Sequence, residues 1–251
     1  MIKLFRRIRQ KLLSENKFSK YLLYAIGEII LVVIGILIAL QINNWNEDLN
    51  IENQREKLIA ALHSDALTTD NRLDFGLQMA SDINQKLSHF LKILSRDNTT
   101  ISRDTLKIYS SYIFQVANFK PAMSSYETAV STGNIALLEN ETLLSQYIQF
   151  KDDYDWFKLH QDISGNMVYL GSVWEFRKKL GSTNLIMKNM GVYPKDFELN
   201  DTDFRAVFKE KETYATFESM QWLVRNQWEA LNRAQMANKA IMETLTSMQN
   251  Q

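Results

Sequence analysis

The chain has 251 residues with 29 basic and 29 acidic side chains, so its formal net charge at pH 7 is zero, and it contains no cysteine. A chain without cysteine has neither disulfides nor thiolate metal sites, and a domain outside the cytoplasm would then depend on packing alone. Eight glycines and two prolines are too few for the turns of a β-sandwich or β-barrel, so the composition predicts an all-α protein.

The first 20 residues are strongly basic, with seven basic side chains and one acidic side chain. Ile2, Phe5, Ile8 and Leu12 recur among them at spacings of three and four, which is typical of a cationic amphipathic helix on an anionic membrane surface. The charge alone would also serve as a topology signal, and both interpretations stay open. The basic residues expected at the interface are Arg6, Arg7, Arg9, Lys11, Lys17 and Lys20.

Residues 21–42 form a long apolar run, YLLYAIGEIILVVIGILIALQI. As a helix, about 22 residues rise roughly 33 Å, against roughly 30 Å of bilayer hydrocarbon. Its 14 Leu, Ile and Val side chains favour insertion by about 4 to 8 kcal/mol, which outweighs the cost of about 3 kcal/mol for Glu28. The run therefore predicts a membrane-spanning helix.

The flanks of this run indicate its orientation. Basic residues precede it and acidic residues follow it, and the positive side stays in the cytoplasm. Tyr21, Tyr24 and Trp45 are placed like aromatic residues at the headgroup level. A cleaved signal peptide would have a shorter apolar region and a small-residue cleavage site, and a lipoprotein would need a cysteine. We therefore expect a signal anchor in the bacterial inner membrane, with the N-terminus cytoplasmic and the C-terminal domain periplasmic or extracytoplasmic.

A stripe of small residues runs along the span, where Gly27, Leu31, Gly35 and Ala39 recur every four residues and Glu28 borders them. Small residues at this spacing let a second helix approach closely, and a polar group in lipid normally finds a partner. We expect a helix–helix contact along this stripe. Gly and Ala are also common in spanning helices that make no such contact, so that alternative stays open.

The region after the span has the apolar periodicity of long helices. Leucines and alanines at spacings of three and four between Asn46 and Leu94 predict a stalk that continues the spanning helix, with Thr68–Asn71 as the point where it could break. Residues 96–100 indicate a turn, and the helical period restarts between Leu106 and Val116.

Capping residues mark the later elements. Pro121 and a capping box at Ser124–Glu127 predict a helix start, and Gly133 is expected to end that helix. Asn140 is expected to cap a helix that runs to Leu180.

The C-terminal part completes the predicted bundle. Residues 181–200 form an irregular stretch, either a functional loop or a crossover, and Asn200 or Asp201 is expected to cap a last long helix. Four long helices result, so we predict an all-α fold in which a single N-terminal transmembrane helix continues into an up-and-down bundle. The expected parts are a cytoplasmic arm (1–20), the span (21–42) and an extracytoplasmic helical domain (43–251).

Two stretches resemble a family of uncharacterised bacterial single-span membrane proteins. The first is Tyr24–Glu47, YAIGEIILVVIGILIALQINNWNE, with a similar lead-in at Lys11–Tyr21. The second and weaker one lies within Pro121–Asn140. Its matching residues are Tyr126, Ser131, Gly133, Asn134, Leu137 and Leu138. The resemblance implies membrane anchorage and a helical outer domain, and it implies no activity.

Motifs for catalysis, metals or cofactors are absent from the sequence. His63, His89 and His160 lack the i, i+4 partner of a helical zinc site, and the acidic run Asp152–Asp155 is better explained as a solvated helix face than as a cation site. No phosphate loop, nucleophile elbow or dinucleotide fingerprint is present. Helical spacing favours core packing over a ligand pocket for four tryptophans. These are Trp156, Trp174, Trp222 and Trp228.

These observations favour a non-catalytic interaction or assembly protein of the bacterial envelope. Its expected partners are the lipid bilayer and either a second copy of the chain, as a homo-oligomer, or another membrane protein. Nucleic acid is disfavoured because the excess basic charge gathers in the first 20 residues. Two alternatives stay open: a ligand-sensing bundle that signals through a lateral membrane partner, and a proton-relay accessory subunit that uses Glu28.

Overall fold

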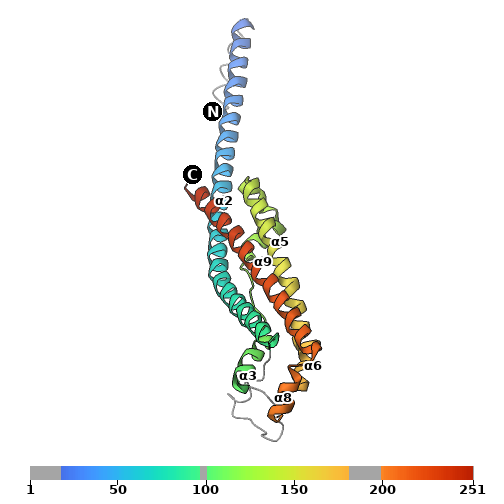
Figure 1. The fold of residues 1–251 in the computed structure, drawn as a ribbon. Helices are drawn as coiled ribbons and strands as arrows, with labels where there is room; N and C mark the ends of the chain where they lie inside the picture. Colours follow the sequence, from blue (N-terminus) through green and yellow to red (C-terminus); the bar gives the residue numbers. More distant parts are fainter. Residues whose placement is uncertain (1–17, 97–100, 181–198, 251) are drawn as a thin grey trace, which may run out of the picture. The chain divides into compact units, whose positions relative to one another are not determined.

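The computed structural model describes residues 18–96, 101–180 and 199–250, and every regular element in these ranges is a helix (Figure 1). The expected all-α fold class is confirmed. The elements are α2 (Phe18–Leu94), α3 (Arg103–Ser111), η2 (Tyr112–Phe114), α4 (Ser124–Thr132), η3 (Asn134–Leu138), α5 (Glu141–Tyr169), α6 (Ser172–Lys179), α8 (Asp201–Val207) and α9 (Lys211–Gln249). The chain divides into two units, Met1–Lys57 and Leu58–Gln251, and we call the second the helical unit.

Helix α2 continues through the polar stretch at which it was expected to break. The Thr68 hydroxyl donates to the carbonyl oxygen of Ser64 at 3.0 Å, and the Asn71 amide donates to that of Leu67 at 3.1 Å. Both side chains thus bond to the preceding turn of the same helix, and they do not interrupt its backbone hydrogen bonds.

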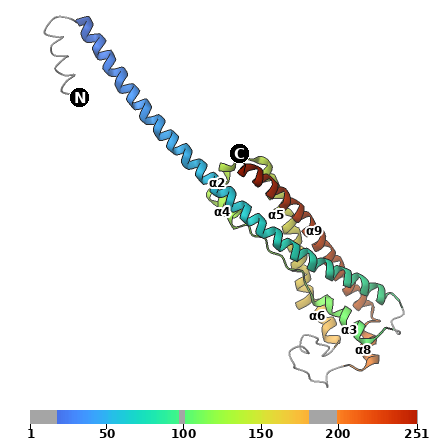
Figure 2. The ribbon, with the colours of Figure 1, turned by 90° about the vertical axis from the view of Figure 1, so that its left-hand side faces the viewer.

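Three long helices build the helical unit within the described residues: the part of α2 after residue 57, α5 and α9 (Figure 2). Side-chain hydrogen bonds join α9 to α2 and to α5, and their positions show that α9 runs antiparallel to both. On α2, Asn238 bonds to Ala66 and Gln221 bonds to Asn84. On α5, Arg233 bonds to Asp153 and Gln227 bonds to Ser164. Because α9 is antiparallel to both helices, α2 and α5 run in the same direction.

The fourth long helix of the predicted bundle is replaced by short helices and by residues 115–123, which contain no helix and which we call the return segment. Figure 2 shows it running beside α2. Proline lacks a backbone N–H and disfavours a helical residue before it, so Pro121 opposes helix here. Side chains of the neighbouring helices supply hydrogen bonds in place of a helical ladder. The Thr69 hydroxyl bonds both the N–H (2.9 Å) and the C=O (3.1 Å) of Ala122.

Two other predicted long helices are interrupted. The helix that starts at Glu141 ends at Tyr169 instead of Leu180, and the last helix is divided into α8 and α9. At the first break a Cβ atom on Gly171 would lie 3.1 Å from the Cα atom of Met167, a tight contact that favours glycine at this position. At the second break Phe208 is buried in the core, where its ring lies 5.8 Å from the rings of Phe90 and Phe176, which are distant in the sequence.

Three of the predicted caps are confirmed and one is wrong. The side chains of Asn140 and Asn200 accept the backbone N–H of the third residue after each, and Gly133 ends α4 with φ of 77°. The capping box at the start of α4 does not form, because Met123 occupies the cap position and makes no side-chain bond there. Asp65 of α2 accepts the N–H of Ser125 at 2.8 Å instead.

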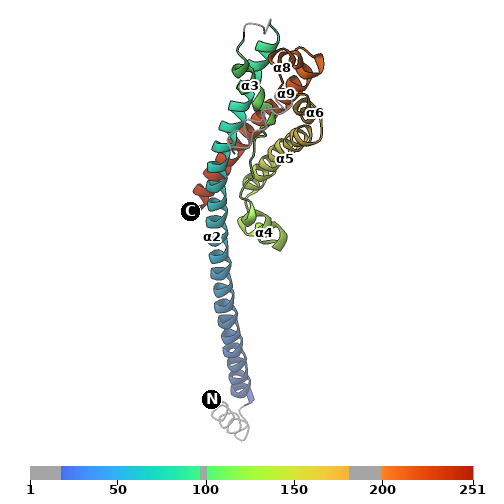
Figure 3. The same cartoon turned by 90° about the horizontal axis from the view of Figure 1, so that it is seen from below.

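The core of the helical unit has two apolar clusters. One, which includes Leu62, Phe157 and Leu231, joins α2, α5, α9 and the return segment. The other includes Phe90 and Phe217, whose ring centroids are 4.9 Å apart, and it also receives side chains from α3, α6 and α8. Figure 3 shows these three short helices at one end of the unit and α4 at the other.

Candidate membrane span and interaction surface

The N-terminal part of α2 exposes a long, predominantly apolar surface. All 14 Leu, Ile and Val side chains between Tyr21 and Ile42 are exposed, and an 18-residue window of this helix has a mean hydropathy of 2.6 with none of it buried. Water disfavours such a surface strongly. By length and composition this helix can cross a membrane, and within the described residues it alone meets that criterion.

The predicted contact stripe lies on this helix. A Cβ atom added at Gly27 or Gly35 would meet no atom within 4 Å, so the chain itself does not need glycine at either position. Leu31 and Ala39 are exposed, and Glu28 is half-buried. A contact of the stripe with a second helix remains a prediction.

The predicted interface residues fall into two groups. Trp45 is exposed on α2, and Lys20, Tyr21 and Tyr24 belong to the same helix, although their side chains are not described. The basic arm lies outside the described residues. Its predicted interface residues are Arg6, Arg7, Arg9, Lys11 and Lys17.

A second exposed apolar surface lies on α5 and α9 of the helical unit. Trp156 is 46% exposed, Leu159 50%, Ile163 40% and Trp222 57%. We call these four residues the aromatic surface. With about 200 Å² for each tryptophan and somewhat less for Leu159 and Ile163, the four side chains together expose on the order of 300 Å². This lies at the lower end of the range of about 300 to 600 Å² for the largest apolar patch of a typical soluble monomer, which often has a function.

The prediction that the tryptophans lie in the core is therefore wrong for three of the four. Trp156, Trp174 and Trp222 are exposed, and Trp228 packs against the core. Helix α5 carries apolar residues both on the side that it buries and on the side that it exposes, so its periodicity alone did not show which side faces the core.

Buried polar groups hold the aromatic surface in place. The ring of His160 lies between the two tryptophans, with centroid distances of 4.6 Å to Trp156 and 5.6 Å to Trp222. His160 is itself buried, and its Nδ1 lies 2.9 Å from the carbonyl oxygen of Trp156. Beneath it, Gln227 donates to the carbonyl oxygen of His160 and to the hydroxyl of Ser164, which joins α9 to α5. The surface is thus built on a fixed helix pair.

Charges at the border of this surface neutralise one another. Lys158 pairs with Asp162 at 2.5 Å along α5, and Arg225 pairs with Glu229 at 2.9 Å along α9. Such exposed pairs contribute little to stability, but within each pair the two opposite charges cancel.

The residues considered for metal binding are separated in the structure. His63 contacts Thr246, and His89 contacts Tyr109. In the acidic run, Asp153 is buried and accepts a hydrogen bond from Arg233 at 2.7 Å, so the run is not uniformly a solvated face. Among the described residues no group of three or more His, Asp or Glu could hold a metal ion.

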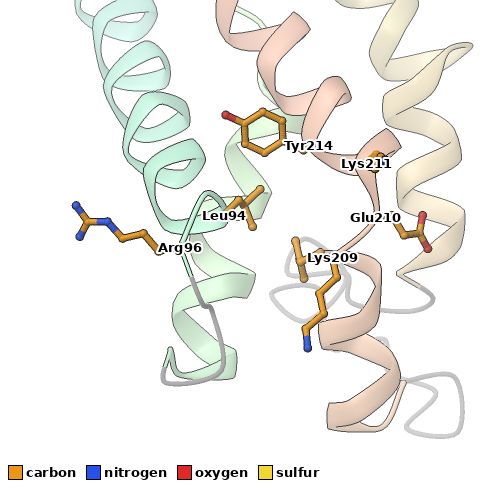
Figure 4. Close-up of a pocket in the computed structure, with 7 residues that line it drawn as sticks. Leu94, Arg96, Lys209, Glu210, Lys211 and Tyr214 are labelled. Atoms are coloured by element: carbon orange, nitrogen blue, oxygen red, sulfur yellow. The ribbon is translucent and has the colours of Figure 1, made fainter.

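A cavity of about 460 Å³ lies between the end of α2 and the junction of α8 and α9 (Figure 4). Leu94 and Tyr214 line it, but the charged side chains do not converge on it. Figure 4 shows Arg96 and Lys209 pointing away from each other. Glu210 pairs with Lys179 at 2.5 Å, and together with Glu212 it raises the pKa of Lys179. The described residues that line this cavity do not converge their polar groups on a position where a ligand could bind.

Comparison with known proteins identifies one family. Residues 28–160, more than half of the chain, match the family described as "Family of unknown function (DUF6090)". No curated protein and no solved structure matches. The matched range begins inside the resembling stretch Tyr24–Glu47 and includes α3, α4 and Trp156, whereas Ile163 and Trp222 lie beyond it. The expected membership of an uncharacterised family is confirmed: the chain belongs to DUF6090, a family of unknown function.

Proposed function

We propose that this protein is a single-pass anchor of the bacterial inner membrane that works by assembly and not by catalysis. In this proposal the basic N-terminus stays in the cytoplasm, and the helical unit lies outside it. The chain binds the bilayer through α2 and binds a second copy of itself, or another membrane protein, through the aromatic surface and the stripe that contains Gly35.

The aromatic surface is the observation that carries this proposal. If a partner covers about 300 Å² of apolar area, and contributes as much itself, about 600 Å² leaves water, which is worth about 15 kcal/mol at about 25 cal/mol per Å². Association costs about 4 to 15 kcal/mol, so this gain is large enough to matter. Confinement of both partners to one membrane raises their effective concentration and lowers that cost.

Single cysteines test the contact, because the chain contains none of its own. We expect Leu159→Cys, in native membranes, to crosslink to a second chain when a short bifunctional maleimide is added. Phe75→Cys is the matched control, since Phe75 is an exposed apolar residue of the helical unit outside the aromatic surface. Equal crosslinking at both positions, or none at Leu159→Cys, would refute self-assembly through this surface.

The membrane stripe is tested in the same way with Gly35→Cys and Leu37→Cys. Side chains two positions apart on a helix are rotated by about 200° about its axis, so Leu37 lies on the opposite side from Gly35. We expect disulfide formation at Gly35→Cys and much less at Leu37→Cys. The reverse order would exclude the stripe as the contact.

The orientation is tested with Lys239→Cys, an exposed position of α9. A charged maleimide that cannot cross membranes is expected to label it in intact spheroplasts. Labelling only after lysis would place the helical unit in the cytoplasm and would overturn the proposed topology.

A further inference from the structure

A groove of about 510 Å³ lies on the helical unit, walled by α2, the return segment, the start of α4 and the middle of α5. Its volume falls within the range of about 300 to 1,000 Å³ that is usual for small-molecule sites. None of its lining residues belongs to the aromatic surface, so the two features are independent. All of them lie within residues 28–160, the range that matches the family.

Two cations of the groove have no acidic partner among the described residues. Arg72 donates one hydrogen bond to the carbonyl oxygen of Lys120 at 3.1 Å, which holds its guanidinium against the return segment. In the described part of the chain, neither Arg72 nor Lys120 forms an ion pair with a carboxylate. An arginine fork and a nearby ammonium group are the usual partners of a ligand carboxylate or phosphate.

Helices α4 and α5 supply groups that accept hydrogen bonds. Glu127 and Asp155 both line the groove, and Asp155 also pairs with Lys151 at 2.5 Å, a contact that raises the pKa of Lys151. Ser124 also lines the groove. These oxygen atoms suit a ligand that carries hydroxyl donors, because an apolar ligand would cover them without giving them partners.

Two tyrosines give the groove flat apolar walls. Tyr126 stacks on Tyr147 with centroids 4.3 Å apart, and Tyr154 meets the ring of Phe119 edge-on at 5.8 Å. Both rings are thus braced by the core, yet each remains half-buried and lines the groove. A braced aromatic ring offers a large contact area to the C–H face of a ring-shaped ligand, at little cost in conformational entropy.

We propose that this groove binds an acidic saccharide, a sugar ring that carries a carboxylate. Arg72 and Lys120 bind the carboxylate, Glu127 and Asp155 accept hydrogen bonds from the sugar hydroxyls, and the tyrosines pack against the ring. A neutral sugar leaves the two cations without a partner. A hydrophobic acid leaves the acceptors unpaired, and inorganic phosphate does not use the tyrosines.

The test is isothermal titration of the full chain in detergent with D-glucuronate as the probe. We expect glucuronate to bind at least tenfold more tightly than D-glucose, benzoate or inorganic phosphate, since each of these lacks one of the three contacts. The absence of glucuronate binding would overturn the proposal. Phosphate binding as tight as glucuronate binding would reduce the groove to a simple anion site and overturn the saccharide assignment.

Substitutions locate the binding. Lys120→Gln changes an exposed side chain, so the fold is retained, and it is expected to weaken glucuronate binding about tenfold. Arg72→Gln is expected to weaken it at least as much, with circular dichroism to verify folding. Lys239→Gln is the matched control, because it removes an exposed cation of α9 outside the groove. Equal affinity in the Lys120 variant and the control would place the sugar elsewhere and refute the site.

Discussion

Replacing Thr69 by valine removes the hydroxyl that holds the return segment to α2 and keeps the shape of the side chain. Thr69 is buried, and its hydroxyl donates to the carbonyl oxygen of Ala122 at 3.1 Å and accepts from the N–H of Ala122 at 2.9 Å. Each unpaired backbone group costs about 1 to 3 kcal/mol when it is removed from water. We expect Thr69→Val to lower the free energy of unfolding by about 2 to 4 kcal/mol, a large share of the usual total of about 5 to 15 kcal/mol.

Urea unfolding of the full chain in detergent micelles, followed by tryptophan fluorescence, measures this loss. With a slope of about 3 kcal/mol per M, the midpoint should fall by about 1 M. Thr68→Val is the matched control, since the hydroxyl of Thr68 is exposed and bonds only within its own helix, and a change within about 0.5 kcal/mol is expected. If the two variants lose the same stability, the Thr69–Ala122 pair does not hold the return segment in the way that the structure indicates.

Two further predictions concern α5. Burial raises the pKa of Tyr147 above its ordinary value of 10.0, so above about pH 10 the unfolded chain loses this proton first and stability falls by up to about 1.4 kcal/mol per pH unit. Tyr147→Phe should remove that part of the fall, and urea unfolding at pH 9 and pH 11 measures it; an identical pH dependence in both proteins would contradict the assignment. Asn140→Ala should lower stability by about 1 kcal/mol and Tm by about 2 to 4 °C, because the side chain of Asn140 caps α5. Asn140→Ser should keep most of that stability in a thermal melt, and equal melting of both variants would argue against the cap.

Several features were predictable because they depend on residues close together in the chain. The apolar run from Tyr21 to Ile42 predicted a helix with exposed apolar side chains, and α2 has such side chains over these residues. Asn140, Asn200 and Gly133 act as caps because each cap depends on a bond or a backbone angle within a few residues.

The aromatic surface and the groove were not predictable in this way. Trp156 and Trp222 belong to helices that have apolar residues on more than one side, and only the packing of α5 against α9 decided which side is exposed. The groove depends on the return segment, whose course between the two predicted helices the sequence did not show, and it brings Arg72, Lys120 and Lys151 together from α2, the return segment and α5.

The sequence by itself thus determined the apolar span, the helical class and the local caps, since each follows from the hydrogen-bonding capacity or the apolar length of neighbouring residues. The tertiary structure decided where the chain leaves the helix, because that choice depends on partners far away in the sequence. Thr69 and Ala122 are 53 residues apart, and Asp65 caps a helix that begins 59 residues later. Such bonds replace the local hydrogen bonds of a helix only after α2 has packed beside the return segment.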